Sequence, residues 1–142
     1  ISVFFTPAKP EDDIIFSKAD RQIPLPISEG ELCNLSLGFP SSIIRPLKLK
    51  IKPGAKSRKS VSHSGIEFVY CLGGELLYVI ADRAYLLEKG DSLLFNAKLQ
   101  HKWQNSSIEY VEILMIFIKS DENEDVMCDL IQTSLELQEG RH

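Results

Sequence analysis

Short apolar runs separated by turn residues recur along most of this 142-residue chain. The turns between them carry Gly, Pro, Asp or Ser, which preset or tolerate the backbone angles of tight turns. Runs this short are typical of β-strands, and their number and spacing predict an antiparallel, all-β sandwich or barrel. Strands are expected over 14–17, 23–25, 32–37, 43–51, 68–72, 76–80, 84–87, 92–95, 101–104 and 110–118.

A helical periodicity follows the last predicted strand. Ser120 or Asp121 can cap a helix whose first turn is acidic. Four apolar side chains are then spaced to share one helical face: Met127, Leu130, Ile131 and Leu135. The sequence therefore predicts a short C-terminal α-helix over about 121–138. An isolated helix of this length is marginal in water, so its apolar face is expected to pack on the barrel wall or against a partner chain.

The length of the chain allows one hydrophobic core and is too short for two ordinary domains. We expect one domain over residues 1–142, with the core barrel at about 45–118 and N-terminal strands within 1–44. No apolar run approaches the ~20 residues that cross a bilayer, which argues against a membrane protein. The apolar opening, residues 1–5, lacks the flanks of a secretory signal. The chain starts at Ile1 instead of Met, which suggests a fragment or a processed form.

The cysteine content and the net charge indicate which cellular compartment and which classes of partner are expected. Cys33, Cys71 and Cys128 are odd in number, far apart and without a Cys-x-x-Cys pair, which argues against disulfides and a cysteine-rich zinc site. We therefore expect a reducing, cytoplasmic location. The formal net charge of −4 gives no overall attraction to nucleic acid. The stretch 45–59 is nevertheless rich in Lys and Arg, and it either protects a solvated edge strand or forms an anion-binding surface.

Residue types that bind transition metals occur at positions compatible with strands. His63 and Glu67 are four residues apart, an even spacing that can project both side chains to one face of an extended strand. His101 opens a later predicted strand. Two imidazoles and one carboxylate form the ligand set of open iron(II) sites, and manganese, nickel or zinc can also use it. The alternative is that the histidines only hydrogen-bond inside the core or lie at the surface.

The segment from Lys52 to Ile118 resembles the two sequence motifs of the cupin superfamily. The first motif is glycine, five residues, His-x-His, three or four residues, glutamate, six residues and glycine. The second motif is glycine, five residues, Pro-x-Gly, two residues, histidine, three residues and asparagine. Six of the ten motif positions agree at the family's spacing: His63, Glu67, Gly74, Gly90, His101 and Asn105. Four positions depart from the motifs: Ala55, Val61, Asn96 and Lys98.

The resemblance implies a cupin double-stranded β-helix, a jelly-roll barrel, with one hairpin between the two motifs. It also implies a divalent transition metal (iron, nickel, zinc or manganese) on His63, Glu67 and His101. Val61 stands where family members often hold a further histidine ligand, so one nitrogen donor is missing and the site is weakened. The alternative is a metal-free barrel in which the same three side chains anchor a small molecule.

Four further residues are expected to line this pocket: Val61, Cys71, Trp103 and Asn105. Asn105 is expected to orient His101. Trp103 shares strand parity with His101, so it either stacks on a ligand or packs in the core. Cys71 shares parity with Glu67, and it either approaches the site as a thiol or is buried and inert.

Two tyrosines could also offer phenol groups to the pocket. These are Tyr70 and Tyr78, but Tyr70 has strand parity opposite to that of Glu67 and is expected outside the pocket. Other catalytic signatures are missing from the sequence: it has no glycine-rich phosphate loop, no Ser/His/Asp nucleophile pattern and no paired-carboxylate motif.

Three phrases, at 67–75, 90–95 and 101–105, resemble a narrower group of cupins. These are the sensor domains that follow an XRE-type helix-turn-helix domain in bacterial transcriptional regulators. The resemblance implies a small-molecule effector, a homodimer, and DNA contact only through a missing helix-turn-helix domain. The alternatives are a metal-dependent enzyme of the iron(II) oxygenase, isomerase or epoxidase type, and a metabolite-binding module. The resemblance favours the regulator over an enzyme.

Overall fold

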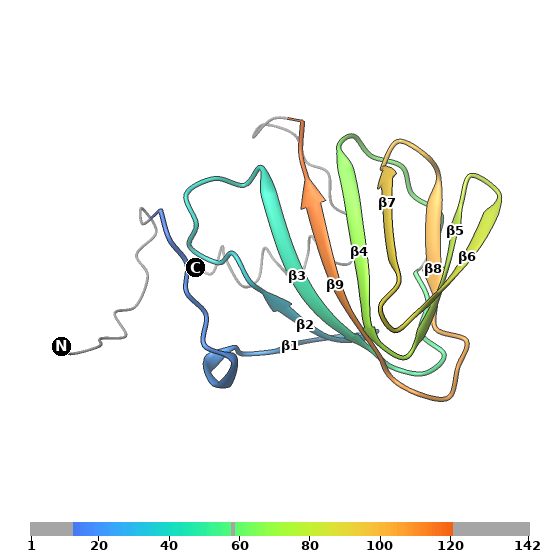
Figure 1. Cartoon of the computed structure of the whole chain (residues 1–142), viewed down its shortest axis with the longest axis horizontal. Helices are drawn as coiled ribbons and strands as arrows, with labels where there is room; N and C mark the ends of the chain where they lie inside the picture. The colour runs from blue at the N-terminus through green and yellow to red at the C-terminus, as the bar shows by residue number, and fades with distance from the viewer. Residues whose placement is uncertain (1–12, 58, 121–142) are drawn as a thin grey trace.

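The computed structural model describes residues 13–57 and 59–120 of the chain (Figure 1). These residues form β-strands joined by turns, with one 3-10 helix, η1, before the first strand. The elements are η1 (Ala19–Arg21), β1 (Leu25–Ile27), β2 (Gly30–Asn34), β3 (Ile44–Ile51), β4 (Ile66–Gly73), β5 (Glu75–Ile80), β6 (Arg83–Glu88), β7 (Ser92–Asn96), β8 (His101–Gln104) and β9 (Val111–Ile118).

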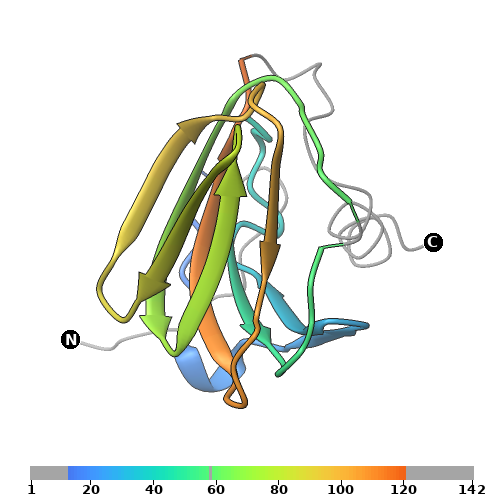
Figure 2. The same ribbon diagram turned by 90° about the vertical axis from the view of Figure 1, so that its right-hand side faces the viewer.

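The strands form two antiparallel sheets. One sheet has six strands in the order β1-β2-β3-β9-β4-β7, and the other has three strands in the order β6-β5-β8. Figure 2 looks onto the side of the molecule where the smaller sheet lies. Buried side chains from both sheets form one hydrophobic core, to which the larger sheet contributes Leu47, Val69 and Ile113 and the smaller sheet contributes Tyr78 and Trp103. This all-β architecture with two sheets is the predicted jelly roll.

Most of the predicted strands are present, within one or two residues at their ends. Residues 14–17 form no strand, because Ile14 and Phe16 are 76% and 69% exposed and the segment pairs with no strand of the described chain. The strand expected at 23–25 instead spans Leu25–Ile27, where it pairs with β2. The apolar opening at 1–5 and the helix predicted at about 121–138 lie outside the described residues. No helix in the described part is long and apolar enough to cross a membrane.

The predicted hairpin between the two cupin motifs is formed by β5 and β6. Ile80 pairs with Arg83, so the loop holds only Ala81 and Asp82. Both loop residues have positive φ, 47° and 70°, which is the backbone conformation of a type I′ turn. This turn suits the right-handed twist of the flanking strands and fixes the register of the smaller sheet.

Strict alternation gives the central strands an inner and an outer face. On β4, Glu67 and Val69 are buried toward the core, whereas Tyr70 is 38% exposed on the outer face, as predicted. The outer face is itself apolar, because cross-strand partners on β3, β9, β4 and β7 form apolar rows. The longest row is Pro46, Ile116, Phe68 and Leu94, and a neighbouring row holds Ile44, Ile118 and Ile66.

Candidate metal centre

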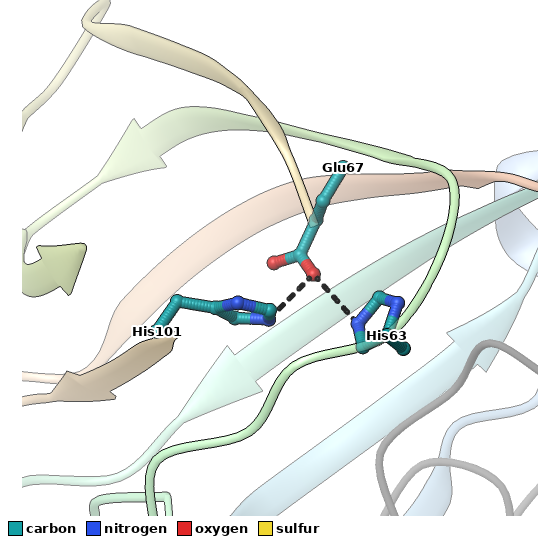
Figure 3. Close-up of side chains that lie close together, drawn as sticks. All are labelled: His63, Glu67 and His101. Carbon is teal, nitrogen blue, oxygen red and sulfur yellow. Dashed lines mark ion pairs between the residues drawn. The ribbon is translucent and has the colours of Figure 1, made fainter. Parts of the chain in front are cut away.

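His63, Glu67 and His101 meet inside the barrel, although they come from three separate segments (Figure 3). Nε2 of His101 lies 3.4 Å from Oε1 of Glu67, and Nε2 of His63 lies 3.6 Å from the same oxygen. One ligand atom from each residue falls within 4.8 Å of the others. Glu67 belongs to the larger sheet and His101 to the smaller sheet, so the cluster lies where the two sheets face each other.

The backbone holds the loop that carries His63 against the start of β8. Val61 and His101 exchange both backbone hydrogen bonds, each 2.9 Å long. The amide of His63 donates to the carbonyl of Ala97, and the amide of Ala97 donates to the carbonyl of Gly65. These four bonds fix the position of His63 relative to His101 before any ligand is present, which is the preorganisation that a metal site requires.

Carbonyl groups orient both imidazole rings. Nδ1 of His101 lies 2.7 Å from the carbonyl oxygen of Leu99, and Nδ1 of His63 lies 3.2 Å from the carbonyl oxygen of Ser64. A carbonyl oxygen only accepts, so Nδ1 carries the proton in each of these hydrogen bonds. In the neutral rings, the lone pairs of the two Nε2 atoms are therefore available toward Glu67.

The cluster fits a divalent cation. Among the described residues, Nε2 of His63 is a buried polar atom without a hydrogen-bond partner, an arrangement that costs free energy unless something binds there. Two neutral imidazole nitrogens and one carboxylate oxygen match the donors that iron(II), manganese, nickel and zinc accept. His63, Glu67 and His101 would hold the metal, and the metal would supply Lewis-acid chemistry at coordination positions that the protein leaves open.

In the metal-free chain, Glu67 and His101 shift each other's pKa values. Burial raises the pKa of the Glu67 carboxyl, but the nearby imidazoles of His101 and His63 lower it more, so this pKa lies below its ordinary value. Burial lowers the pKa of His101, but the hydrogen bond and charge of Glu67, with the Leu99 carbonyl, raise it above its ordinary value. Without a metal, the two groups therefore stabilise each other's charged forms.

This coupling predicts how the stability of the metal-free chain depends on pH. In the unfolded chain His101 loses its proton near pH ~6.5, whereas in the folded chain it keeps the proton to a higher pH. The folded state then binds more protons than the unfolded state, so the free energy of unfolding falls as pH rises from about 6.5 through the folded pKa. Urea unfolding of chelator-treated protein at several pH values measures this slope. The variant Glu67→Gln is the control, and an equally steep slope in that variant would contradict the assignment.

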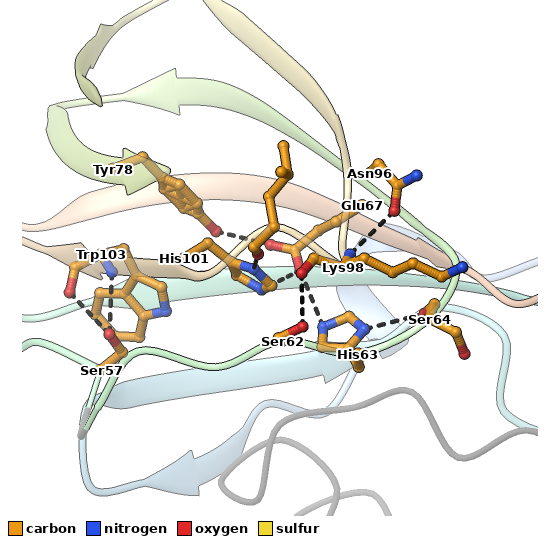
Figure 4. A network of polar contacts seen from close by, with 11 residues as sticks. Ser57, Ser62, His63, Ser64, Glu67, Tyr78, Asn96, Lys98, His101 and Trp103 are labelled. Atoms are coloured by element: carbon orange, nitrogen blue, oxygen red, sulfur yellow. Dashed lines mark hydrogen bonds and ion pairs between the residues drawn. The ribbon is translucent and has the colours of Figure 1, made fainter. Parts of the chain in front are cut away.

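Tyr78 is a further member of the centre, buried on β5. Its hydroxyl donates a hydrogen bond to Oε2 of Glu67 at 3.1 Å, which leaves Oε1 facing the two imidazoles (Figure 4). The sequence marked Tyr78 only as a tyrosine that could face the pocket. Strand alternation is the signal that places Tyr78 and Glu67 on inner faces, but their contact requires knowledge of how the sheets pack.

Replacing Tyr78 with Phe tests this positioning role. The change removes one hydrogen bond to a buried charged group, so we expect a loss of about 1.5–3 kcal/mol in the free energy of unfolding. Metal affinity is expected to fall about 10-fold, because the carboxylate is less well oriented. The control is Tyr70→Phe on the exposed outer face of β4. Equal effects of the two variants on metal affinity would show that Tyr78 does not position the carboxylate of Glu67.

Aromatic side chains form an apolar wall around the cluster. The ring of Phe95 lies 4.9 Å from that of His101, and the ring of Phe117 lies 5.9 Å from that of His63. Both phenylalanines are nearly fully buried. Neither was predicted as a site residue, although their inward parity on β7 and β9 was a usable signal. Such surroundings limit access of water and strengthen the electrostatic interactions of the centre.

Val61 lies beside His101, as its place in the motif implies. The two residues are directly opposite each other in an antiparallel bridge, so their side chains project to the same side. An apolar isopropyl group therefore occupies the neighbourhood in which many cupins hold another histidine. The described residues bring three metal-binding side chains together here, His63, Glu67 and His101.

Asn105 has a different role from the predicted one. Its side-chain amide donates to the carbonyls of Ile51, Lys52 and Glu109, and its oxygen accepts from the amide and hydroxyl of Ser107. None of these described bonds reaches His101, which is oriented by Leu99 instead. Asn105 is fully buried and ties together the loops that flank β8 and β9.

Cys71 and Trp103 lie on inner faces but are placed differently from the ligands. Cys71 is four residues along β4 from Glu67, about 13 Å at the rise of a strand. Its thiol is fully buried, donates to the carbonyl of Gly74, and has a pKa raised by that burial. This corresponds to the inert, buried alternative. Trp103 is 7% exposed and is part of the core cluster.

The two-sheet jelly roll and a buried His-Glu-His cluster define a cupin barrel with a candidate metal centre. The model of the family described as "Cupin domain" matches residues 47–117, half of the chain. The chain therefore belongs to the cupin family. No curated protein shows significant similarity to it.

Solved structures of other cupins are similar to the chain. The cupin domain of an XRE family transcriptional regulator from Enterobacter cloacae is 25% identical, with 61% of this chain and 93% of that chain covered, and a TM-score of 0.54. An RmlC-like cupin from Shewanella frigidimarina is 19% identical, with 76% and 93% covered and a TM-score of 0.64. A sugar phosphate isomerase of the cupin superfamily from Silicibacter pomeroyi is 22% identical, with 66% and 62% covered and a TM-score of 0.58.

Proposed function

We propose that the chain is the effector-binding cupin domain of a cytoplasmic, DNA-binding transcriptional regulator. The observation that carries this proposal is the similarity to the cupin domain of the Enterobacter cloacae regulator, 93% of which is covered at 25% identity. The phrases at 67–75, 90–95 and 101–105 support the same assignment from the sequence. DNA would be contacted by a separate helix-turn-helix domain.

The effector is proposed to bind at the buried centre. His63, Glu67 and His101 would bind it either through a divalent metal or directly as polar anchors within the apolar wall of Phe95 and Phe117. An effector regulates DNA binding only if it binds one arrangement of the protein more tightly than another. Strand β4 carries Glu67 on its inner face and apolar side chains on its outer face, so it connects the pocket with the surface.

The outer face of the larger sheet supports a homodimer. Its apolar rows run across four strands and include Leu94, Ile66 and Ile44, which are 66%, 44% and 43% exposed. Contiguous exposed apolar surface of this kind is typical of protein interfaces. A two-fold dimer would also present two DNA-binding domains to a palindromic operator.

Native mass spectrometry of the purified chain, combined with DNA binding by the full-length gene product, tests the proposal. A regulator is expected to be a dimer that retains a small molecule unchanged. The full-length product is expected to bind DNA upstream of its own gene, with an affinity that changes when the small molecule is removed. A full-length product that binds no DNA would overturn the proposal.

A metal-dependent enzyme is the second candidate function. The donor set of the centre favours it, since two histidines and one carboxylate leave coordination positions open for a substrate. A structure with the same fold, 22% identical to this chain, is that of a sugar phosphate isomerase, which supports keeping the enzyme as an alternative. Consumption of a candidate substrate by the iron(II)-loaded or zinc-loaded chain, abolished by Glu67→Gln, would favour the enzyme over the regulator.

A further inference from the structure

A hollow lies on the outside of the barrel, on the far side of β8 from the metal centre. Its volume is about 220 Å³. It is lined from three directions by residues 56–57 and 59–60, by β8 and by β5. The lining residues are Lys56, Ser57, Lys59, Ser60, Leu77, Val79, Lys102, Trp103 and Gln104.

The hollow concentrates positive charge on a chain whose net charge is −4. Lys56, Lys59 and Lys102 are exposed at its rim, and no carboxylate is among the lining residues that the structure describes. Within residues 13–57 and 59–120, none of these three ammonium groups forms an ion pair. Like charges gathered around one concave surface repel each other and raise the local concentration of anions.

The backbone fixes two of the lysines in place. Lys56 is directly opposite Gln104 in an antiparallel bridge, so both side chains project from the same side of the sheet. The amide of Ser57 donates to the carbonyl of Trp103, and the amide of Trp103 donates to the hydroxyl of Ser57 (Figure 4). Lys102 alternates outward between the buried His101 and Trp103 on β8.

The floor of the hollow restricts the kind of anion. Leu77 and Val79 form an apolar floor beneath the lysines, which suits an organic body attached to the charged group. The volume is below that of typical drug-sized pockets, so the ligand is small. The aromatic residue of the lining, Trp103, is buried and offers no exposed face on which bases could stack, which disfavours single-stranded nucleic acid.

We propose that this hollow is an anion site for a small phosphate monoester, held by Lys56, Lys59 and Lys102 over the apolar floor. Three ammonium groups match a phosphate, which carries close to two negative charges, better than they match a single carboxylate. Gln104 and Ser60 add neutral donors at the rim. The site is separate from the metal centre, and the inference does not depend on the proposed regulatory function.

The test is a titration of the isotopically labelled chain with phenyl phosphate, followed by amide chemical shifts at constant ionic strength. We expect saturable shifts at Lys56, Lys102 and Gln104, with a Kd below about 1 mM. Inorganic phosphate, which has no apolar body, is expected to bind the same amides more weakly. The fluorescence of Trp103, the single tryptophan, provides a second readout.

Paired variants decide whether the lysines form the site. The double variant Lys56→Gln and Lys102→Gln is expected to raise the Kd for phenyl phosphate at least about tenfold. Lys50→Gln, an exposed lysine on β3 in the other sheet, is the matched control and is expected to leave the Kd unchanged. Dispersed amide spectra of both variants verify that they are folded.

Four outcomes would overturn the proposal. Shifts that follow salt concentration without saturating indicate only general screening, and equal binding of benzoate indicates no selectivity for phosphate. Shifts at His63, Glu67 and His101 in place of those at the hollow assign the ligand to the metal centre. Tighter binding of a single-stranded oligonucleotide than of phenyl phosphate identifies a nucleic-acid surface.

Discussion

Glu67→Gln and His101→Ala are each expected to lower the affinity of the chain for zinc and manganese by at least about 100-fold. Loss of a residue that only orients a metal ligand lowers metal affinity by about 10- to 100-fold. Loss of one of the three ligands is therefore expected to lower metal affinity by at least the upper end of this range. Gln retains the shape of Glu67 and can still accept the hydrogen bond from Tyr78, but it removes the negative charge next to two imidazoles. Isothermal titration and native mass spectrometry measure the affinity and the metal content.

The matched control for the charge is Glu112→Gln on β9. Glu112 is an exposed carboxylate on the outer face of the same sheet, so the control makes the same chemical change away from the centre. It is expected to leave metal binding unchanged. If neither the wild-type chain nor the control binds any divalent metal more tightly than millimolar, the centre is a set of polar anchors and the metal assignment is wrong.

Much of the fold follows from local patterns that a single sequence carries. Alternation along β4 places Glu67 inside and Tyr70 outside, and the spacing of turn residues marks most strands within two residues. The segment 14–17 shows the limit of this reasoning. Its apolar residues have the composition of a strand, but a strand also needs a partner, and partners are set by the tertiary fold.

The sequence singled out the three residues that the structure brings together, but it did not reveal most of their surroundings. His63, Glu67 and His101 could be identified because their motifs resemble those of a known family. Tyr78 and Phe95 meet the cluster from other strands, and such contacts depend on how the barrel closes. The role of Asn105 was predicted incorrectly, because parity places it inside but does not show which backbone groups need a partner.

The grouping of lysine residues in the structure also differs from their grouping along the sequence. The lysines of the stretch 45–59 divide between the two sheets, with Lys50 on β3 and Lys56 beside β8. Lys102, from a different part of the sequence, joins Lys56 at the hollow. Neither a charge run nor the net charge shows this grouping, because it depends on the bridge between Lys56 and Gln104 of β8.

Gly65 connects the stability of the barrel with the geometry of the centre, and Gly65→Ala is expected to damage both. Gly65 lies between His63 and Glu67 with a φ of 95°, a conformation that L side chains rarely adopt. A Cβ atom there would overlap the backbone carbonyl oxygen of Ile118 at the end of β9. Relief of this overlap requires movement of the loop that carries His63 away from β9.

The matched control is Gly54→Ala, because Gly54 has a similar φ of 80° but a Cβ atom there would meet nothing within 4 Å. That variant isolates the conformational cost, about 1–2 kcal/mol. Gly65→Ala adds the backbone overlap to this conformational cost. We therefore expect its free energy of unfolding to fall by more than about 3 kcal/mol and its metal binding to weaken as well. Denaturant unfolding and metal titration of the two variants measure both effects. Equal losses of stability and metal affinity in the two variants would mean that the close approach to β9 does not position the loop. Larger losses in Gly65→Ala alone would mean that the contact between this loop and the end of β9 positions the centre.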